Sequence, residues 1–491
     1  MDKTKSLKAQ AVRGVFWSSL DRIGQQGIRF VIMIILARLL VPEQFGLIGM
    51  LTIFMEVARS FVDSGFSAAL IQKKEVTDVD ISSAFYINVL IGLAEMGLFY
   101  VGAPWVADFY HQPILTPLMR VLSLSLVIGS LTCVHTALLC RRIDFQTQLK
   151  VGIAATVLSG GIGIGMAAQG FGVWSLVAQY LANSFLRTVF LWGLNVWHPR
   201  LVFSVASVRG MFGFGSRLLA AGLLNTIFED LYLVVIGRLF SAGQLGLYTS
   251  ARRIETLATT NTTNVVTHVA FPVFSQIQDD PVRLKRSLRK AMTMLALVHF
   301  PVIVGLAVTA RPLVYVLLSA KWAASIPWLQ LLCLVGASYP FQALLLNTLK
   351  AKGRSDLFFN LEVFKKVLTV LAIAITYRWG VAGMIWGQVV LSVVCYYINS
   401  YYVIRLVHYR LQEQLADLAP YAAMSMLMGL GVYFVRFLSL PGAAALLLVQ
   451  VLVGIVLYAG LSYVLGLPAF LEAAHAAGDR LRMSVLSPGR S

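Results

Sequence analysis

The stretch ARLLVPEQFGL at residues 37–47 has a near copy 200 positions later, GRLFSAGQLGL at residues 237–247. The Arg, Gln and Gly of the first copy recur at the matching positions of the second. Each copy ends one long apolar run and begins the next, so each is expected to join two helices. A repeated helix junction at a fixed offset predicts that the chain contains two related halves.

Composition places these helices in a membrane. The chain has 491 residues, of which 58% are hydrophobic and 13% are charged, with a mean hydropathy of +0.77. A soluble protein has about 25% charged residues. Apolar runs of the length that spans a bilayer recur along the whole sequence. The sequence therefore predicts an all-α integral membrane protein with about 14 transmembrane helices.

The distribution of basic residues predicts the orientation. The net charge is +18, and alternate connections carry 24 and 6 of the 40 Lys and Arg residues. Because cytoplasmic connections collect positive charge, this bias predicts an even number of spans with both termini in the cytoplasm. The charge thus indicates membrane topology and not nucleic-acid binding. The basic N-terminal segment leads into a long first helix, which we interpret as an uncleaved span and not a signal peptide.

The same offset aligns two polar stripes in otherwise apolar helices. The helix expected at 45–71 carries Glu56, Arg59 and Asp63, and the helix expected at 246–272 carries threonines at equivalent positions. Spacings of three and four residues put each set on one helical face. We therefore predict an N-terminal six-helix lobe (1–200), a parallel C-terminal six-helix lobe (201–410), and two extra helices with a cytoplasmic tail (411–491). Two like halves around a cavity favour alternating-access transport over a channel or scaffold.

Polar side chains at membrane depth are costly and predict a functional site. Guanidinium groups match the geometry of phosphate oxygens, and hydroxyl or amide groups suit sugars. The candidate substrate-binding residues are Arg22, Gln25, Arg29, Arg59, Asp63, Thr256, Thr259 and Thr263. Two alternatives stay open: Arg59 could be neutralised by Glu56 and Asp63, and the threonines could make ordinary interhelical hydrogen bonds.

An acidic pair in the second half suggests a second role. Glu229 and Asp230 either bind a coupling cation or pair with arginines across the lobe interface. His299 is expected to be a packing residue. The four cysteines form no CxxC pair, so we expect neither a disulfide framework nor a metal site, and the sequence predicts no cofactor.

The order of several short motifs resembles a known family. ARLLVPEQFGLIGM, GLYTSARRIE (246–255) and FPVFSQIQDD (271–280) resemble Wzx-like polysaccharide flippases of the MOP superfamily, which include colanic acid and teichuronic acid exporters. The resemblance implies a multi-pass protein of the bacterial inner membrane that is not an enzyme. It implies two lobes around a cavity, where cationic residues receive undecaprenyl-pyrophosphate-linked oligosaccharide units. The implied partners are this lipid-linked oligosaccharide, membrane lipid and the polysaccharide polymerase or export machinery.

Three other functions are weighed against this one. A multidrug or cation antiporter of the same superfamily would favour acidic cation sites in an apolar cavity, which the arginines oppose. A peptidoglycan-precursor flippase is compatible with the same cavity. A membrane polysaccharide polymerase usually has a long external loop, whereas the longest connection here has about 18 residues. The sequence contains no GxxxxGK[ST] motif, so ATP hydrolysis by the chain is not expected.

Overall fold

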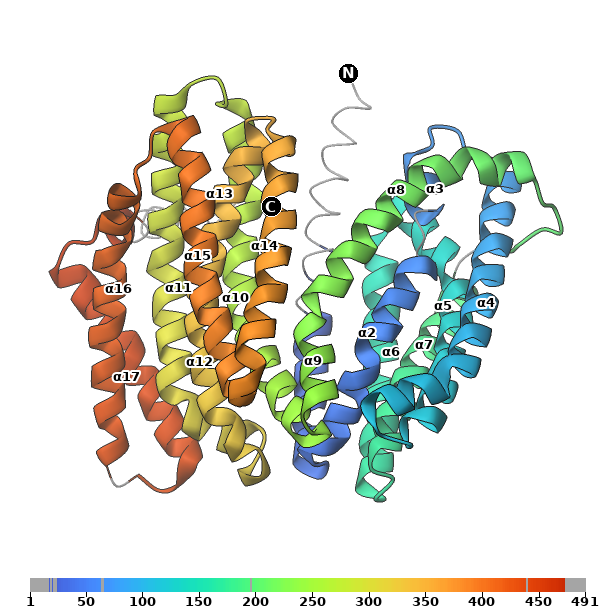
Figure 1. The fold of residues 1–491 in the computed structure, drawn as a ribbon, viewed down its shortest axis with the longest axis horizontal. Coiled ribbons are helices and arrows are strands. Elements are labelled where there is room, and N and C mark those ends of the chain that lie inside the picture. The colour runs from blue at the N-terminus through green and yellow to red at the C-terminus, as the bar shows by residue number, and fades with distance from the viewer. Residues whose placement is uncertain are drawn as a thin grey trace, which may run out of the picture. The chain divides into compact units, whose positions relative to one another are not determined.

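The computed structural model describes residues 17, 20, 24–62, 66–194, 197–438 and 440–472 (Figure 1). These residues form helices joined by short turns, and no β-strand occurs among them, which confirms the all-α prediction. Nine helical stretches of the described chain are long and apolar enough to cross a membrane. The count of about 14 spans remains a prediction.

The helices pack into two compact units, Met1–Thr249 and Ser250–Ser491. The boundary lies inside α10 (Ala242–Gln276), so the first turns of this helix belong to the first unit and the remainder to the second. These units follow packing, whereas the predicted boundaries at residues 200 and 410 follow the sequence repeat. The repeat boundaries therefore stay predictions.

The first unit begins with a helical segment at residues 24–39. It continues with α2 (Pro42–Val62), α3 (Phe66–Gln72), α4 (Asp78–Tyr110), α5 (Leu115–Arg141), α6 (Phe145–Ala168), α7 (Val173–Leu194), α8 (Val205–Glu229) and α9 (Leu231–Leu239). α5 lies at its centre, since it packs on α2, α3, α4 and α7 and buries Leu118, Leu126 and Val134 almost completely. Small residues allow the closest approach, as where Gly92 of α4 meets Ser130 of α5.

The second unit contains the rest of α10, followed by seven α-helices and three 3-10 helices. These are α11 (Pro281–Leu317), η1 (Ala320–Ser325), α12 (Ile326–Gly336), α13 (Tyr339–Ala351), α14 (Ser355–Thr376), η2 (Tyr377–Trp379), α15 (Gly380–Val407), α16 (Leu411–Phe434), η3 (Val435–Phe437) and α17 (Gly442–Val464). α11 supplies the core, because Leu284, Leu288, Met292 and Leu295 recur at helical spacing and are all buried. This face packs mainly on α16 and α17.

Two apolar runs, at 208–237 and 325–349, each predict one continuous span, but the structure breaks both. The first is divided into α8 and α9 at Asp230, and the second is divided into α12 and α13. The second break has a clear cause in the sequence. Pro340 has no N–H to donate to the carbonyl of Gly336 four residues earlier, and the imidazole of His299 takes that carbonyl instead, with Nε2 3.1 Å from the oxygen.

The repeated junction, at residues 37–47 and 237–247, forms a close helix crossing. A Cβ atom built on Gly46 of α2 would overlap the carbonyl oxygen of Ala242 and lie 2.6 Å from its carbonyl carbon. A Cβ atom on Gly246 of α10 would meet the carbonyl of Pro42 in the same way, also 2.6 Å from the carbon. The two glycines are equivalent in the repeat, and so are Pro42 and Ala242. The conserved spacing of the two copies thus corresponds to a pseudo-symmetric contact between their second helices.

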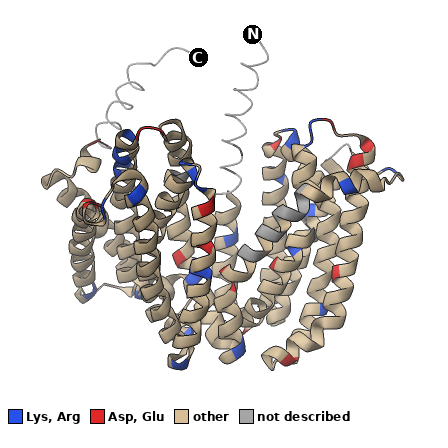
Figure 2. Cartoon of the chain, turned by 45° about the horizontal axis from the view of Figure 1, so that its top comes forward, with Lys and Arg blue, Asp and Glu red and all other residues tan. Residues whose placement is uncertain are grey.

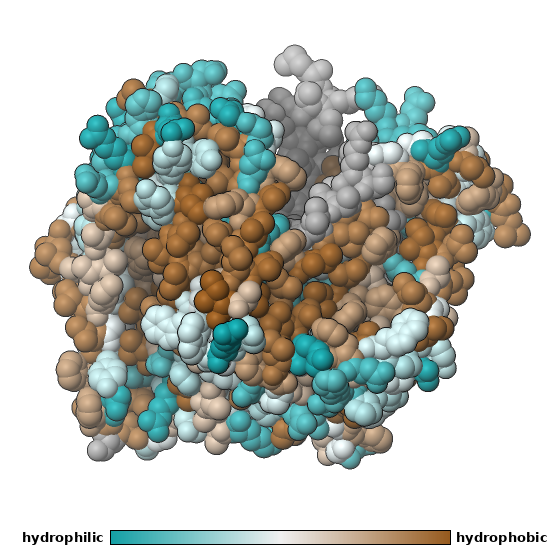
Figure 3. Space-filling model, viewed as in Figure 1, coloured by the Kyte–Doolittle hydropathy of each residue, from teal (hydrophilic) through white to brown (hydrophobic). Residues whose placement is uncertain are grey.

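Charged residues gather around the ends of the helices (Figure 2), and the visible face shows an apolar belt between hydrophilic ends (Figure 3). In the second unit, Lys285 pairs with Glu413 at 2.8 Å and donates to the carbonyl of His408 at 3.0 Å. Lys352 donates to the carbonyl of Gln278. The α10–α11, α13–α14 and α15–α16 connections, which are alternate connections with Lys and Arg in or beside them, therefore lie at one end of this unit.

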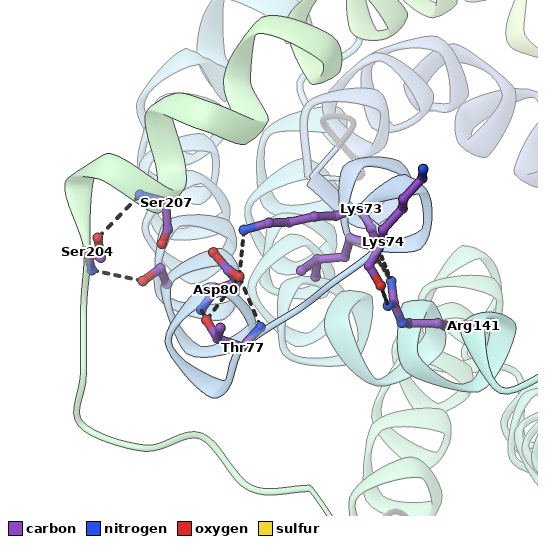
Figure 4. A network of polar contacts seen from close by, with 9 residues as sticks. Lys73, Lys74, Thr77, Asp80, Arg141, Ser204 and Ser207 are labelled. Carbon is purple, nitrogen blue, oxygen red and sulfur yellow. Dashed lines mark hydrogen bonds and ion pairs between the residues drawn. The ribbon is translucent and has the colours of Figure 1, made fainter.

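The first unit has a matching polar network at its α3–α4 connection (Figure 4). The carboxylate of Asp80 accepts the N–H of Thr77 at 3.0 Å, which caps the start of α4. The same carboxylate pairs with Lys73 at 2.7 Å. Arg141 donates to the carbonyls of Leu70, Lys73 and Lys74. Nearby, the N–H of Ser204 donates to the hydroxyl of Ser83 at 2.9 Å, which attaches the start of α8 to α4.

Removal of the Asp80 carboxylate should destabilise this end of the first unit. Asp80 is only 2% exposed, and Asp80→Ala leaves the cap of α4 and Lys73 without their acceptor. We expect the free energy of unfolding to fall by about 1–3 kcal/mol, the range for buried polar groups that lose a partner. The control is Asp78→Ala, which removes an exposed ion pair to Arg200 and should change stability little. Equal melting temperatures of the two purified variants would contradict this assignment.

Candidate functional site

The first candidate pair lies on the first helix. The guanidinium of Arg29 donates to the side-chain oxygen of Gln25 at 3.0 Å, one helical turn earlier. Gln25 in turn lies against Gly152 of α6, where there is no room for a larger residue. Arg29 is exposed within its unit. The arrangement lets Gln25, which is held by α6, orient the Arg29 guanidinium.

Arg59 on α2 has two neighbours. Its guanidinium is 3.9 Å from the carboxylate of Glu56 and lies 5.2 Å above the ring of Tyr180 on α7. The side chain remains 49% exposed. The predicted pair with Glu56 is therefore present but loose, and the ring of Tyr180 forms a second support that the sequence had not indicated.

The two arginines differ in their depth along the helices. With a rise of 1.5 Å per residue, Arg29 lies about 15 Å before the end of the first helix, and Arg59 lies about 26 Å after the start of α2. Both distances are measured from the turn that joins these helices. The two arginines therefore differ by about 10 Å in their distance from that turn.

Two candidates, Arg22 and Asp63, lie outside the described residues. Of the three candidate threonines, all on α10, only Thr256 is exposed, and its hydroxyl donates to the Glu255 carboxylate at 3.3 Å. Thr259 is 4% exposed and donates to the Glu255 carboxylate at 2.6 Å, and Thr263 is 6% exposed and donates to the backbone carbonyl of Thr259. The alternative of ordinary hydrogen bonds therefore describes Thr259 and Thr263 better than direct contact with a substrate.

A buried polar cluster in the second unit was not expected from the sequence. Glu255 is 9% exposed and accepts from Thr259, and its carboxylate occupies the space beside Gly336 of α12. His299 is fully buried, and its Nδ1 is 2.9 Å from the hydroxyl of Thr262. The other imidazole nitrogen, Nε2, lies 3.1 Å from the carbonyl oxygen of Gly336. Both ring nitrogens of His299 therefore make polar contacts inside the packed unit, as expected for a packing residue.

The acidic pair lies at the break between α8 and α9. Glu229 is the last residue of α8, and Asp230 separates the two helices. The N–H of Asp230 donates to the carbonyl of Thr226, and the carbonyl of Asp230 accepts from Leu233 as α9 begins. Interrupted helices often provide ion-binding groups inside transporters. Within the described chain, no group of three or more His, Cys, Asp or Glu side chains is placed to hold a metal ion.

The family is decided by a match over more than half of the chain. Residues 35–327 match the sequence profile of a family described as polysaccharide biosynthesis protein. The chain belongs to this family. The match contains the repeated junction, Arg59, the acidic pair and the whole of α10, and it begins after Arg22, Gln25 and Arg29.

Curated relatives of this polysaccharide biosynthesis protein agree with that membership. The chain is 29% identical to the lipopolysaccharide biosynthesis protein WzxC of Escherichia coli (strain K12), over 80% of this chain and 81% of the relative. It is 29% identical to the teichuronic acid biosynthesis protein TuaB of Bacillus subtilis (strain 168), over 82% and 84%. It is also 29% identical to the succinoglycan biosynthesis transport protein ExoT of Rhizobium meliloti (strain 1021), over 79% and 80%.

Solved structures identify the fold. The chain resembles the lipid II flippase MurJ in an inward closed conformation, with a TM-score of 0.76, 16% identity, and coverage of 91% of this chain and 98% of that one. It also resembles an inward-facing multidrug resistance MATE family transporter of the MOP superfamily, with a TM-score of 0.61, 17% identity, and coverage of 78% and 95%. The fold is therefore that of MOP superfamily transporters, and the predicted resemblance to polysaccharide flippases is confirmed. The polysaccharide biosynthesis protein is a membrane transporter and not an enzyme.

Proposed function

We propose that this transporter flips undecaprenyl-pyrophosphate-linked oligosaccharide repeat units across the bacterial inner membrane by alternating access, for export of a surface polysaccharide. The observation that carries the proposal is Arg59, a half-exposed guanidinium in an apolar helix of a polysaccharide biosynthesis transporter. A carboxylate at 3.9 Å neutralises it only in part, so its N–H groups can donate hydrogen bonds to a phosphate oxygen. The relatives support the substrate class, since their names place them in polysaccharide biosynthesis and, for ExoT, in transport.

The different depths of the two arginines suggest the order in which they contact the substrate as it crosses the bilayer. We place both termini in the cytoplasm, because the basic connections predict this orientation. The turn after the first helix then faces outward, with Arg59 toward the cytoplasmic leaflet and Arg29 near the middle of the bilayer. Arg59 would receive the pyrophosphate and Arg29, with Gln25, would bind it during passage. Thr256 is the exposed candidate threonine for the glycan, and Arg22 and Asp63 remain candidates from the sequence alone.

Glu229 and Asp230 are the candidates for a coupling cation. They stand where α8 ends, and a helix C-terminus carries partial negative charge that adds to the two carboxylates. A cation gradient would then supply the energy. The polysaccharide polymerase and export machinery are the expected partners on the product side.

The antiporter alternative rests on the fold shared with MATE transporters. Loss of the gene separates the two functions. We expect the loss to abolish the surface polysaccharide and to leave lipid-linked repeat units on the inner leaflet, measured by extraction and by accessibility to an externally added glycan-binding protein. Expression of the wild-type gene from a plasmid is the control. Drug hypersensitivity with intact polysaccharide would contradict the proposal and favour the antiporter.

A further inference from the structure

A second binding site is indicated by a cavity within the second unit. It has a volume of about 880 Å³ and lies among α11, α12, α16, η3 and α17. None of the residues proposed above for the substrate lines it. Its polar lining consists of Arg311, Tyr315, Gln330, Tyr433, Arg436 and Gln450.

Two guanidinium groups give this cavity a positive charge. Arg436 donates to the hydroxyl of Tyr433 at 2.7 Å, and its guanidinium lies 4.6 Å from the centre of that ring and 5.1 Å from that of Phe437. In the part of the chain that the structure describes, neither Arg311 nor Arg436 forms an ion pair with a carboxylate. Like charges that line one cavity in an apolar setting favour a bound anion.

A buried hydrogen-bond acceptor in the cavity wall, on Gln450, adds an independent requirement for the ligand. Gln450 of α17 lines the cavity and is only 2% exposed. Its amide nitrogen donates to the carbonyl of Val432 at 3.2 Å, just before α16 tightens into η3, and this bond fixes the amide. Its Oε1 accepts no hydrogen bond from any described residue. Because an unmet buried acceptor is costly, a ligand here should supply a hydrogen-bond donor as well as an anion.

The position in the membrane and the apolar walls indicate a lipid. Arg311 lies 30 residues after Pro281, the start of α11, which is about 45 Å along the helix. The basic connections lie at the start of α11, so the cavity lies at the opposite headgroup region of a bilayer about 40–45 Å thick. Leu334 and Leu446 line the apolar side, and Leu334 is 49% exposed. α17 beside it is strongly apolar and presents Leu448 and Leu452 to its surroundings.

We propose that this cavity binds the headgroup of an anionic glycerophospholipid, for which phosphatidylglycerol is the matching chemistry. The phosphate lies between Arg311 and Arg436, a headgroup hydroxyl donates to Gln450 Oε1, and the acyl chains follow the leucines and α17. With both termini in the cytoplasm, this lipid belongs to the outward-facing leaflet. A prenyl phosphate supplies the same anion but has no hydroxyl beside it, so Gln450 favours the glycerophospholipid.

Native mass spectrometry of the full-length protein, titrated separately with phosphatidylglycerol, phosphatidic acid and undecaprenyl phosphate, tests this site. Charge-assisted hydrogen bonds to phosphate predict that Arg311→Ala/Arg436→Ala weakens phosphatidylglycerol binding about tenfold or more. The matched control is Arg378→Ala, which removes a guanidinium 5.9 Å from the Tyr377 ring and outside the cavity. Arg311→Lys/Arg436→Lys keeps the charge but not the planar fork, so its loss should be intermediate. Binding by the alanine variant equal to that of the Arg378 control would overturn the proposal.

Gln450→Leu tests the headgroup hydroxyl. This variant removes the acceptor together with the amide donor to the Val432 carbonyl. It should weaken phosphatidylglycerol binding several-fold and leave the binding of phosphatidic acid, which lacks the headgroup hydroxyl, nearly unchanged. Unchanged melting of each variant in detergent serves as the folding control. If wild type retains undecaprenyl phosphate better than phosphatidylglycerol, and the double arginine variant loses both, the glycerophospholipid assignment is wrong. Because no export is measured, the outcome is independent of the proposed flippase function.

Discussion

Gly46→Ala and Gly246→Ala should each abolish polysaccharide export, and each should reduce the amount of folded protein in the membrane. The added methyl group would overlap a backbone carbonyl of the opposing helix, Ala242 in one case and Pro42 in the other. Backbone cannot rotate away as a side chain can, so α2 and α10 would have to separate. Overpacking of this kind costs about 1–3 kcal/mol and more where the backbone must move.

The matched control for these variants is Gly97→Ala on α4, since a Cβ atom built there meets nothing within 4 Å. A helical glycine in open space should tolerate alanine or gain stability from it. Fluorescence size-exclusion chromatography with a melting series would give the amount of folded protein and its stability. The crossing as described would be refuted if both junction variants matched the Gly97 variant in melting temperature and export.

Arg59→Ala and Arg29→Ala should each reduce export by one to two orders of magnitude at normal expression. The physical reason is the loss of charge-assisted hydrogen bonds to phosphate, which contribute about 1.5–3 kcal/mol each, or about 10–100-fold in an equilibrium constant. Lysine at either position should restore part of the activity, because it keeps the charge but not the fork. The measurement is surface polysaccharide in a deletion strain that carries each variant.

The two arginine variants should differ in where the substrate stops. Arg59→Ala should weaken binding of the lipid-linked unit to purified protein, whereas Arg29→Ala should bind it and fail to transport it. Arg120→Ala is a suitable control, because that arginine also lies in an apolar helix but is occupied by the ring and carbonyl of Tyr100. Full export by both Arg59→Ala and Arg29→Ala would show that these arginines do not bind phosphate. The fold assignment would not be affected.

Much of the architecture could be predicted because membranes leave strong patterns in sequence. Long apolar runs, the bias of Lys and Arg between connections, and the 200-residue offset are each readable without coordinates. Breaks within helices were harder to predict. Pro340 did carry a signal for the α12–α13 break, but its effect depends on His299, which is distant in sequence and takes the carbonyl of Gly336. The break at Asp230 has no proline or glycine to mark it.

The sequence predicted the residue types of the candidate site better than the directions in which their side chains point. A spacing of three or four residues puts side chains on one face but does not say what that face meets. Thr259 and Thr263 share a face with Thr256 and yet are buried with Glu255. The support of Arg59 by Tyr180 joins distant helices and leaves no local pattern. The lipid cavity had one signal, since Arg311 and Arg436 are two of only six basic residues expected on the outward side.

The packing of α8 and α9 on α2 has an evolutionary consequence. By the sequence repeat these helices open the second copy, but they contact α2, α3 and α4 of the first copy. If the 200-residue offset records a gene duplication, the second copy supplies helices that complete the packing of the first, as in a domain swap within a single polypeptide. A cut or a recombination between homologues at the predicted repeat boundary at residue 200 would then deprive α2 of α8 and α9 and disrupt the packing of the first unit.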